Sequence, residues 1–199
     1  MITGSAAGDA QSQLQNKTNL KLDFDKNGKA TIVGGKAKTK ADRMLKKMIN
    51  DDKRTVEIKA ENSNEFTAHD GNKYKYENNG GGAYGGSTVA ADGHTTAYQY
   101  VNPQQLANWD AKVGDQQSGG YMLHEVAEGY ASSRIAFRKG TGDAVGGSRY
   151  DAVHQKANRI SGGNWYRTDN YITIPNFSLK PFPHIKLGAS QIKITKYSR

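Results

Sequence analysis

Three polar side chains between positions 122 and 130 have the types and spacing of a site that could hold a metal and activate water. His124 and Glu128 are four residues apart, so on a helix they lie one turn apart on the same face. Imidazole nitrogen and carboxylate oxygen are both ligands that zinc accepts, and the adjacent Glu125 has the chemistry of a general base. Apolar residues that would anchor such a helix surround them, namely Met122, Leu123, Val126, Ala127 and Tyr130.

The segment from His124 to Glu128 departs at one position from the zinc-peptidase pattern H-E-x-x-H. In that pattern the two histidines bind zinc and the glutamate activates a water molecule. Here Glu128 replaces the second histidine. Catalytic zinc sites also accept two histidines with one glutamate, so the replacement is chemically tolerable. An oxygen-richer site is less selective for zinc and could favour manganese or another divalent ion.

The third ligand should be a second histidine, and His154 is the best candidate. It lies in a segment, residues 150–159, that predicts a helix with Ala152, Val153 and Ala157 toward the core. The glycine-rich connection over residues 140–147 would let this helix fold back on the first. His69 and His94 flank predicted turns and remain alternative ligands. The competing interpretation is that the His–Glu pair is an ordinary structural contact along one helix.

Composition limits the class of protein without naming its function. The chain of 199 residues, with 35% hydrophobic residues, 23 glycines and 4 prolines, suits one loop-rich globular domain. No apolar run approaches the roughly 18 residues of a membrane-spanning helix, and the N-terminal residues lack the features of a signal peptide. The absence of cysteine leaves histidines and carboxylates as the metal ligands.

The net charge of +9 raises the question of a nucleic-acid partner. Its basic residues are scattered along the chain, however, which is typical of a solvated face. The most concentrated basic patch is near the C-terminus and comprises Lys186, Lys193, Lys196 and Arg199.

Hydrophobic periodicity predicts an α+β fold. Asn-Gly or Asp-Gly turns predict hairpins over residues 20–33, 66–74 and 88–98. Residues 39–50 predict an amphipathic helix and residues 55–60 a half-buried strand. The glycine cluster over residues 80–86 indicates a flexible connection. We therefore expect a flexible leader over residues 1–18, one domain over 19–170, and a basic β tail over 171–199 that belongs to the same domain.

The order of these elements resembles the minimal zincin metallopeptidases. Tyr100-Val101-Asn102-Pro103, then a loop, then Tyr121-Met122-Leu123-His124-Glu125 looks like their edge strand followed by the active-site helix. Residues 36–160 also look like the C-terminal effector domains of Rhs-repeat polymorphic toxins from Bacteroidetes-type bacteria. The resemblance implies a zincin-like twisted sheet with an N-terminal backing helix, an active-site helix and a following helix.

The resemblance also assigns roles to residues. His124, Glu128 and, by analogy, His154 would bind zinc, and Glu125 would be the catalytic base. The strand over residues 95–101 would bind an extended peptide by strand addition, and Tyr150, Tyr166 or His184 would stabilise the oxyanion. It further implies a protein or peptide substrate, an immunity or delivery protein as partner, and export from a bacterial cell by a specialised secretion system.

Three functions are therefore carried forward. The favoured one is a zinc-dependent, peptidase-like effector or toxin domain that hydrolyses a peptide bond through a metal-activated water. The second is a cationic toxin domain directed at nucleic acid, which would require a continuous basic face. The third is a non-catalytic β-rich interaction module in which the His–Glu pair is structural.

Overall fold

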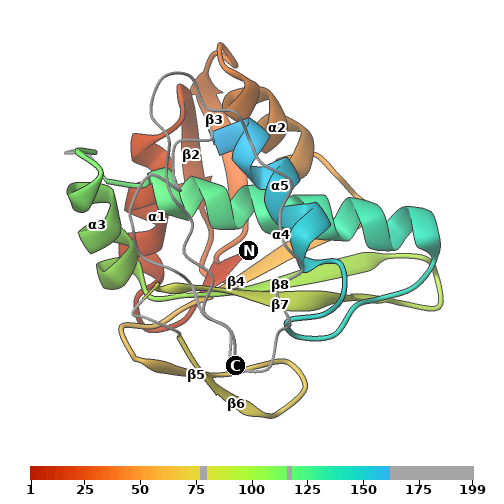
Figure 1. The fold of residues 1–199 in the computed structure, drawn as a ribbon. Helices are drawn as coiled ribbons and strands as arrows, with labels where there is room; N and C mark the ends of the chain where they lie inside the picture. The colour runs from red at the N-terminus through yellow and green to blue at the C-terminus, as the bar shows by residue number, and fades with distance from the viewer. Residues whose placement is uncertain (77–79, 116–117, 162–199) are drawn as a thin grey trace, which may run out of the picture.

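A mixed sheet lies beneath one long helix in the computed structural model, which describes residues 1–76, 80–115 and 118–161 (Figure 1). These residues form a mixed α+β fold. The helices are α1 (Ala7–Asn16), α2 (Lys40–Ile49), α3 (Pro103–Lys112), α4 (Gly120–Lys139) and α5 (Tyr150–Ser161). The strands are β1 (Ile2–Thr3), β2 (Leu20–Phe24), β3 (Ala30–Gly35), β4 (Arg54–Ala60), β5 (Glu65–Thr67), β6 (Lys73–Lys75), β7 (Gly82–Val89) and β8 (Thr95–Val101).

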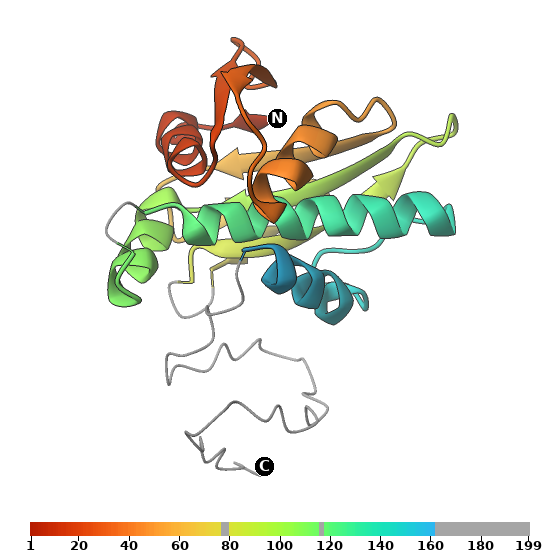
Figure 2. The same ribbon diagram turned by 90° about the horizontal axis from the view of Figure 1, so that it is seen from above.

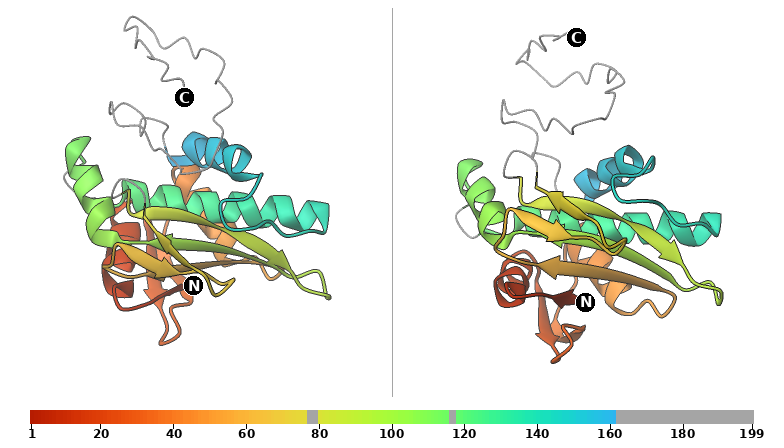
Figure 3. Two further views of the ribbon diagram at one scale, coloured as in Figure 1. Left: turned by 60° about the horizontal axis from the view of Figure 1, so that its bottom comes forward. Right: turned by 90° about the horizontal axis from the view of Figure 1, so that it is seen from below.

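The main sheet has the strand order β1-β4-β8-β7. Strands β1, β4 and β8 are parallel, and β7 runs antiparallel to β8 at the edge. Helix α4 crosses one face of this sheet, and the β5–β6 hairpin lies on the other face (Figures 1 and 3). On that second face, Phe66 of β5 stacks on Tyr100 of β8 with their ring centroids 4.5 Å apart.

Local sequence signals fix where the helices begin. Thr39 caps α2, because its hydroxyl accepts a hydrogen bond from the Asp42 backbone N–H, and the Asp42 carboxylate accepts one from the Thr39 N–H. Asn102 caps α3, and Pro103 occupies its first turn. Asp110 of α3 accepts hydrogen bonds from the backbone of Gly119 and Tyr121, which holds the start of α4.

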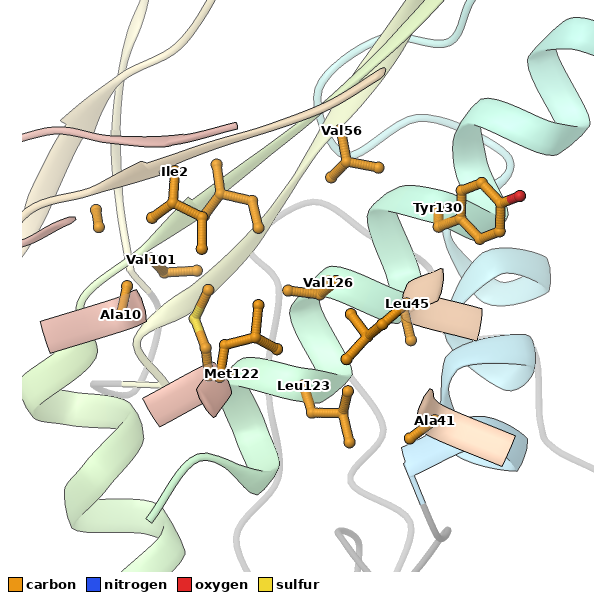
Figure 4. Close-up of a cluster of buried hydrophobic side chains, with 14 of the residues drawn as sticks. Ile2, Ala10, Ala41, Leu45, Val56, Val101, Met122, Leu123, Val126 and Tyr130 are labelled. Carbon is orange, nitrogen blue, oxygen red and sulfur yellow. The ribbon is translucent and has the colours of Figure 1, made fainter. Parts of the chain in front are cut away.

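The main core forms where α4 meets the sheet. Met122 and Val126 of α4 are fully buried against Val101 of β8, and Leu45 of α2 closes the cluster (Figure 4). Ala10 and Leu14 of α1 belong to the same cluster. The apolar face of α4 is therefore covered over its N-terminal half, where the candidate ligands lie.

The prediction of a flexible leader over residues 1–18 is wrong. Residues 2–3 pair with β4 as a parallel strand, and α1 buries Ala10 and Leu14 in the core. The prediction failed because most residues of α1 are polar and its apolar face is narrow. The helix that covers this face, α4, is more than 100 residues away in the chain.

Three other expectations need correction. The glycine cluster over residues 80–86 is a connection only at its start, because β7 begins at Gly82. Strand β8 is not an edge strand, since it lies between β4 and β7. The segment after Asn102 is not all loop, because it contains α3.

The remaining local predictions are confirmed where the structure describes them. All three hairpins form, as β2–β3, β5–β6 and β7–β8. The helix expected over residues 39–50, the strand over 55–60 and the helix over 150–159 are α2, β4 and α5. The tail over residues 171–199, together with Tyr166 and His184, lies outside the described residues. Within the described chain, no helix has both the length and the apolar character needed to cross a lipid bilayer.

Gly129 allows α4 to lie close to the sheet. A Cβ atom at this position would lie 2.6 Å from Val56 Cγ1 and 3.1 Å from Gln99 Cγ. Gly8 in α1 is the natural control, because a Cβ there would meet no atom within 4 Å.

We predict opposite effects for alanine at these two glycines. Gly129→Ala should lower the free energy of unfolding by about 1–3 kcal/mol through overpacking. Gly8→Ala should raise it by up to about 1 kcal/mol, since alanine is the better helix former. Urea denaturation measures both, and an equal stabilisation by the two variants would contradict close packing at Gly129.

Candidate metal centre

Three side chains from two helices converge on one point. His154 Nδ1 of α5 lies 2.7 Å from Glu128 Oε2 of α4, and His124 Nε2 lies 3.5 Å from the same oxygen. The two histidine nitrogens are 3.2 Å apart. His124, Glu128 and His154 therefore form a group of ligand atoms with the proximity that a metal ion requires. The structure thus brings together the three residues that the sequence predicted as ligands, in a cluster that could hold a metal ion.

A serine on α5 sets the orientation of the His124 ring. Ser161 Oγ donates a hydrogen bond to the Ala157 carbonyl at 3.0 Å, so its lone pairs face other donors. His124 Nδ1 lies 3.4 Å from that oxygen, which can accept from Nδ1–H in the tautomer that carries its proton there. In that tautomer the opposite nitrogen, Nε2, carries a lone pair toward the cluster, which is the arrangement found in metal-binding histidines.

Burial makes the two α4 ligands ready to bind a cation. His124 and Glu128 are 3% and 2% exposed. Burial lowers the pKa of His124, which favours its neutral form. Burial alone would raise the pKa of Glu128, but hydrogen bonds and charge interactions with His124 and His154 hold it below its ordinary value. A neutral imidazole facing an ionised carboxylate is the protonation state that metal binding needs.

Helix α5 is held in place by a chain of contacts that begins on the edge strand. The Tyr84 hydroxyl of β7 contacts Ser132 of α4 at 2.9 Å and donates to the Asp143 carboxylate at 3.1 Å. That carboxylate also accepts from the Arg149 backbone N–H, just before α5. The Tyr150 ring then packs on His154, with ring centroids 5.1 Å apart. The predicted oxyanion residue Tyr150 thus lies beside the cluster and supports its third member.

Glu125 lies between α4 and the sheet. A Cβ at Gly82 of β7 would lie 2.2 Å from Glu125 Oε1, so glycine at this position leaves room for the carboxylate where it lies. Burial, followed by the nearby charge of Glu128, raises the pKa of Glu125 well above its ordinary value. A raised carboxyl pKa is what a group needs to exchange protons near neutral pH.

Gln99 of β8 is fully buried and reaches both carboxylates. In one orientation its Nε2 lies 3.3 Å from Glu128 Oε1. With the amide turned over, its nitrogen donates to Glu125 Oε2 at 3.1 Å and to the Ala83 carbonyl at 2.9 Å, and its oxygen accepts from the Gly129 N–H. The second orientation satisfies both ends of the amide and orients Glu125.

The donor geometry fits a zinc-sized ion. Tetrahedral zinc with bonds of about 2.0–2.1 Å separates its ligand atoms by about 3.3 Å. The three distances of 2.7, 3.2 and 3.5 Å scatter around that value. The His154 side chain is 18% exposed, whereas His124 and Glu128 are nearly closed off. His154 is therefore the most exposed of the three side chains of the cluster.

The other two histidines of the described chain are elsewhere. His69 stacks on Tyr98, with ring centroids 4.1 Å apart, and His94 Nε2 contacts the Thr55 hydroxyl at 2.9 Å. Neither belongs to the cluster, so both are eliminated as the third ligand.

Sequence reasoning missed Gln99 and Ser161. Gln99 alternates with Ala97 and Val101, which are buried residues of the same strand. A polar residue at such a position faces the core, and this pattern could have identified Gln99 from the sequence. Ser161 follows His154 by seven residues, two helical turns along the same face, but the predicted helix ended at residue 159.

Comparisons with protein-family models, with curated proteins and with solved structures found no match for this chain. The assignment of the site therefore depends on its residues and their geometry.

The role of Ser161 can be tested through metal affinity. Ser161→Ala should weaken zinc binding by about 10–100-fold, because the His124 ring loses the partner that fixes its tautomer. Ser12→Ala is a matched control, since Ser12 makes the same helical hydrogen bond to a carbonyl four residues back, at Gly8. Competition with a chromophoric chelator measures both affinities, and an equal loss in both variants would contradict the assigned role.

Proposed function

We propose that this chain is a metal-dependent hydrolase domain of the zincin type that cleaves peptide bonds. The observation that carries the proposal is the convergence of His124 Nε2, Glu128 Oε2 and His154 Nδ1 within bonding range of one cation, with His154 partly exposed. A divalent ion bound there would polarise a carbonyl group and lower the pKa of a water molecule.

Glu125 supplies the proton transfers in this proposal. Its carboxylate is one residue from a ligand, is buried, and has a raised pKa. Such a group takes a proton from the attacking water and returns it to the leaving amine. Gln99 keeps the carboxylate oriented by donating to Oε2, and Gly82 provides the space that it occupies.

The edge strand β7 supports an extended substrate. Gly82, its first residue, lies beside Glu125. Further along, the backbone edge is already occupied, because Ser87 pairs with Asp143 and the Tyr84 carbonyl accepts a hydrogen bond from the Gly146 N–H. An extended peptide would therefore add to the beginning of β7. This placement replaces the earlier expectation that β8 binds the peptide. The toxin role, the immunity or delivery partner and export from the cell are extensions of the same proposal by resemblance.

The proposal predicts the metal content of the protein. The purified protein should bind about one equivalent of zinc, and His124→Ala or His154→Ala should abolish this binding by removing one of three ligands. His69→Ala should retain it, because His69 is outside the cluster. Inductively coupled plasma mass spectrometry gives the metal content. If the wild-type protein neither contains a divalent metal nor takes one up on titration, the hydrolase proposal fails and the interaction module becomes the better interpretation.

The second prediction separates catalysis from metal binding. Glu125→Gln keeps the size of the side chain and its hydrogen bonding but removes the proton acceptor. We expect unchanged zinc content and a fall in peptide hydrolysis of about 100-fold or more, measured by mass spectrometry on a mixed peptide library. A variant that lost zinc in parallel with activity would make Glu125 a ligand and not the base.

A further inference from the structure

Four cations lie on the surface of α4 and α5 and are not part of the metal cluster. Arg134 and Arg138 are one turn apart on α4, and Lys156 and Arg159 are three residues apart on α5. The two helices lie side by side (Figure 2). Arg134, Arg138 and Arg159 are exposed, and Lys156 is half-buried. We call these four residues the α4–α5 cationic surface.

The four cations of this surface are not among the cations of the described chain that pair with a carboxylate. Lys17, Arg54, Lys59 and Lys75 each pair with an aspartate or glutamate. Among the described residues, no carboxylate lies within 4.0 Å of any cation of the α4–α5 surface. Asp51, on the neighbouring segment, is occupied by Arg54 and by the Tyr130 hydroxyl.

The charges of these four side chains interact with one another. Partial burial and then the charges of Arg138, Arg134 and Arg159 lower the pKa of Lys156. Like charges that interact in this way repel one another, which opposes folding. A polyanion bound over them would remove that repulsion.

An exposed aromatic ring lies beside the arginines. Phe137, between Arg134 and Arg138 in the chain, is 37% exposed, which makes it one of three large exposed hydrophobic residues in the described chain. The Arg54 guanidinium lies 5.1 Å from its ring centroid. A cationic surface with an exposed aromatic ring is the combination that single strands use, because phosphates bind the cations and bases stack on the ring.

We propose that the α4–α5 cationic surface, with Phe137 at its rim, binds a single-stranded nucleic acid through its phosphate backbone. Three of the four cations are arginines, whose planar guanidinium matches a phosphate group in two hydrogen bonds. A phosphate chain accounts for the cations and the exposed ring together, whereas an acidic protein surface would account only for the cations. The proposal is independent of the hydrolase function, because none of these residues belongs to the metal cluster.

The test compares two double variants with the same loss of charge. Arg134→Gln with Arg138→Gln removes two cations from the surface, and Lys21→Gln with Lys29→Gln removes two exposed cations from the β2–β3 hairpin. Fluorescence anisotropy with a fluorescein-labelled 20-nucleotide oligo-uridine and its oligo-thymidine counterpart gives affinity at several salt concentrations. The full chain is used, and thermal melting verifies that each variant folds.

We expect the arginine double variant to reduce the slope of log affinity against log salt by about 1.4, since each phosphate contact contributes about 0.7 for single strands. The lysine double variant should change it by less than half as much. Phe137→Ala should weaken binding about fivefold or more while leaving the slope unchanged, because stacking carries no counterion release. Oligo-uridine and oligo-thymidine results distinguish RNA from DNA as the preferred strand.

Three results would overturn the proposal. The first is no binding of either oligonucleotide by the wild-type chain, and the second is an equal change of slope in the two double variants. The third is a Phe137→Ala variant that binds the oligonucleotides as tightly as the wild type, together with a wild-type affinity for heparin equal to that for the oligonucleotides. Binding should also be the same with zinc and with a chelator. A negative result for nucleic-acid binding is therefore distinct from a negative result for the metal site, which is judged by metal content alone.

Discussion

The close approach of α4 to the centre of the sheet is the constraint on which the rest of the structure depends. At Gly129 the helix passes so near β4 and β8 that a single methyl group would overlap Val56. This approach brings the side chain of Gln99 within reach of both glutamates of the helix. It also places the Glu125 carboxylate against Gly82 of β7. A helix packed at an ordinary distance would leave Glu125 without its partner from the sheet.

Placing ionisable groups at this interface has a cost that their partners must offset. Buried carboxylates are unfavourable unless hydrogen-bonded or paired with a cation. Glu128 is stabilised as an anion by two histidines, and Glu125 meets the same problem by shifting its pKa upward. Two glutamates three residues apart thus acquire opposite proton affinities from their surroundings, a division of roles common in acid–base sites.

The third member of the cluster depends on a different part of the fold. His154 reaches the helix α4 ligands because α5 folds back along α4, and the loop between them is fixed to β7 through Asp143. Strand β7 therefore has two roles: it leaves space for Glu125, and it holds the loop that leads into α5. The same pair of helices also carries the α4–α5 cationic surface, none of whose residues belongs to the cluster.

The sequence alone determined most of the local elements and the identity of the residues in the candidate cluster. Spacing of four residues placed His124 and Glu128 on one helical face, and turn signals located the hairpins, because both depend on short-range geometry. His154 was inferable as the third ligand only because a glycine-rich connection allowed the return of its helix. Tertiary structure alone decided that α1 is part of the core, that β7 and not β8 is the edge strand, and that Gln99 and Ser161 contact the site. Those facts depend on packing between segments far apart in the chain, for which a local pattern carries no signal.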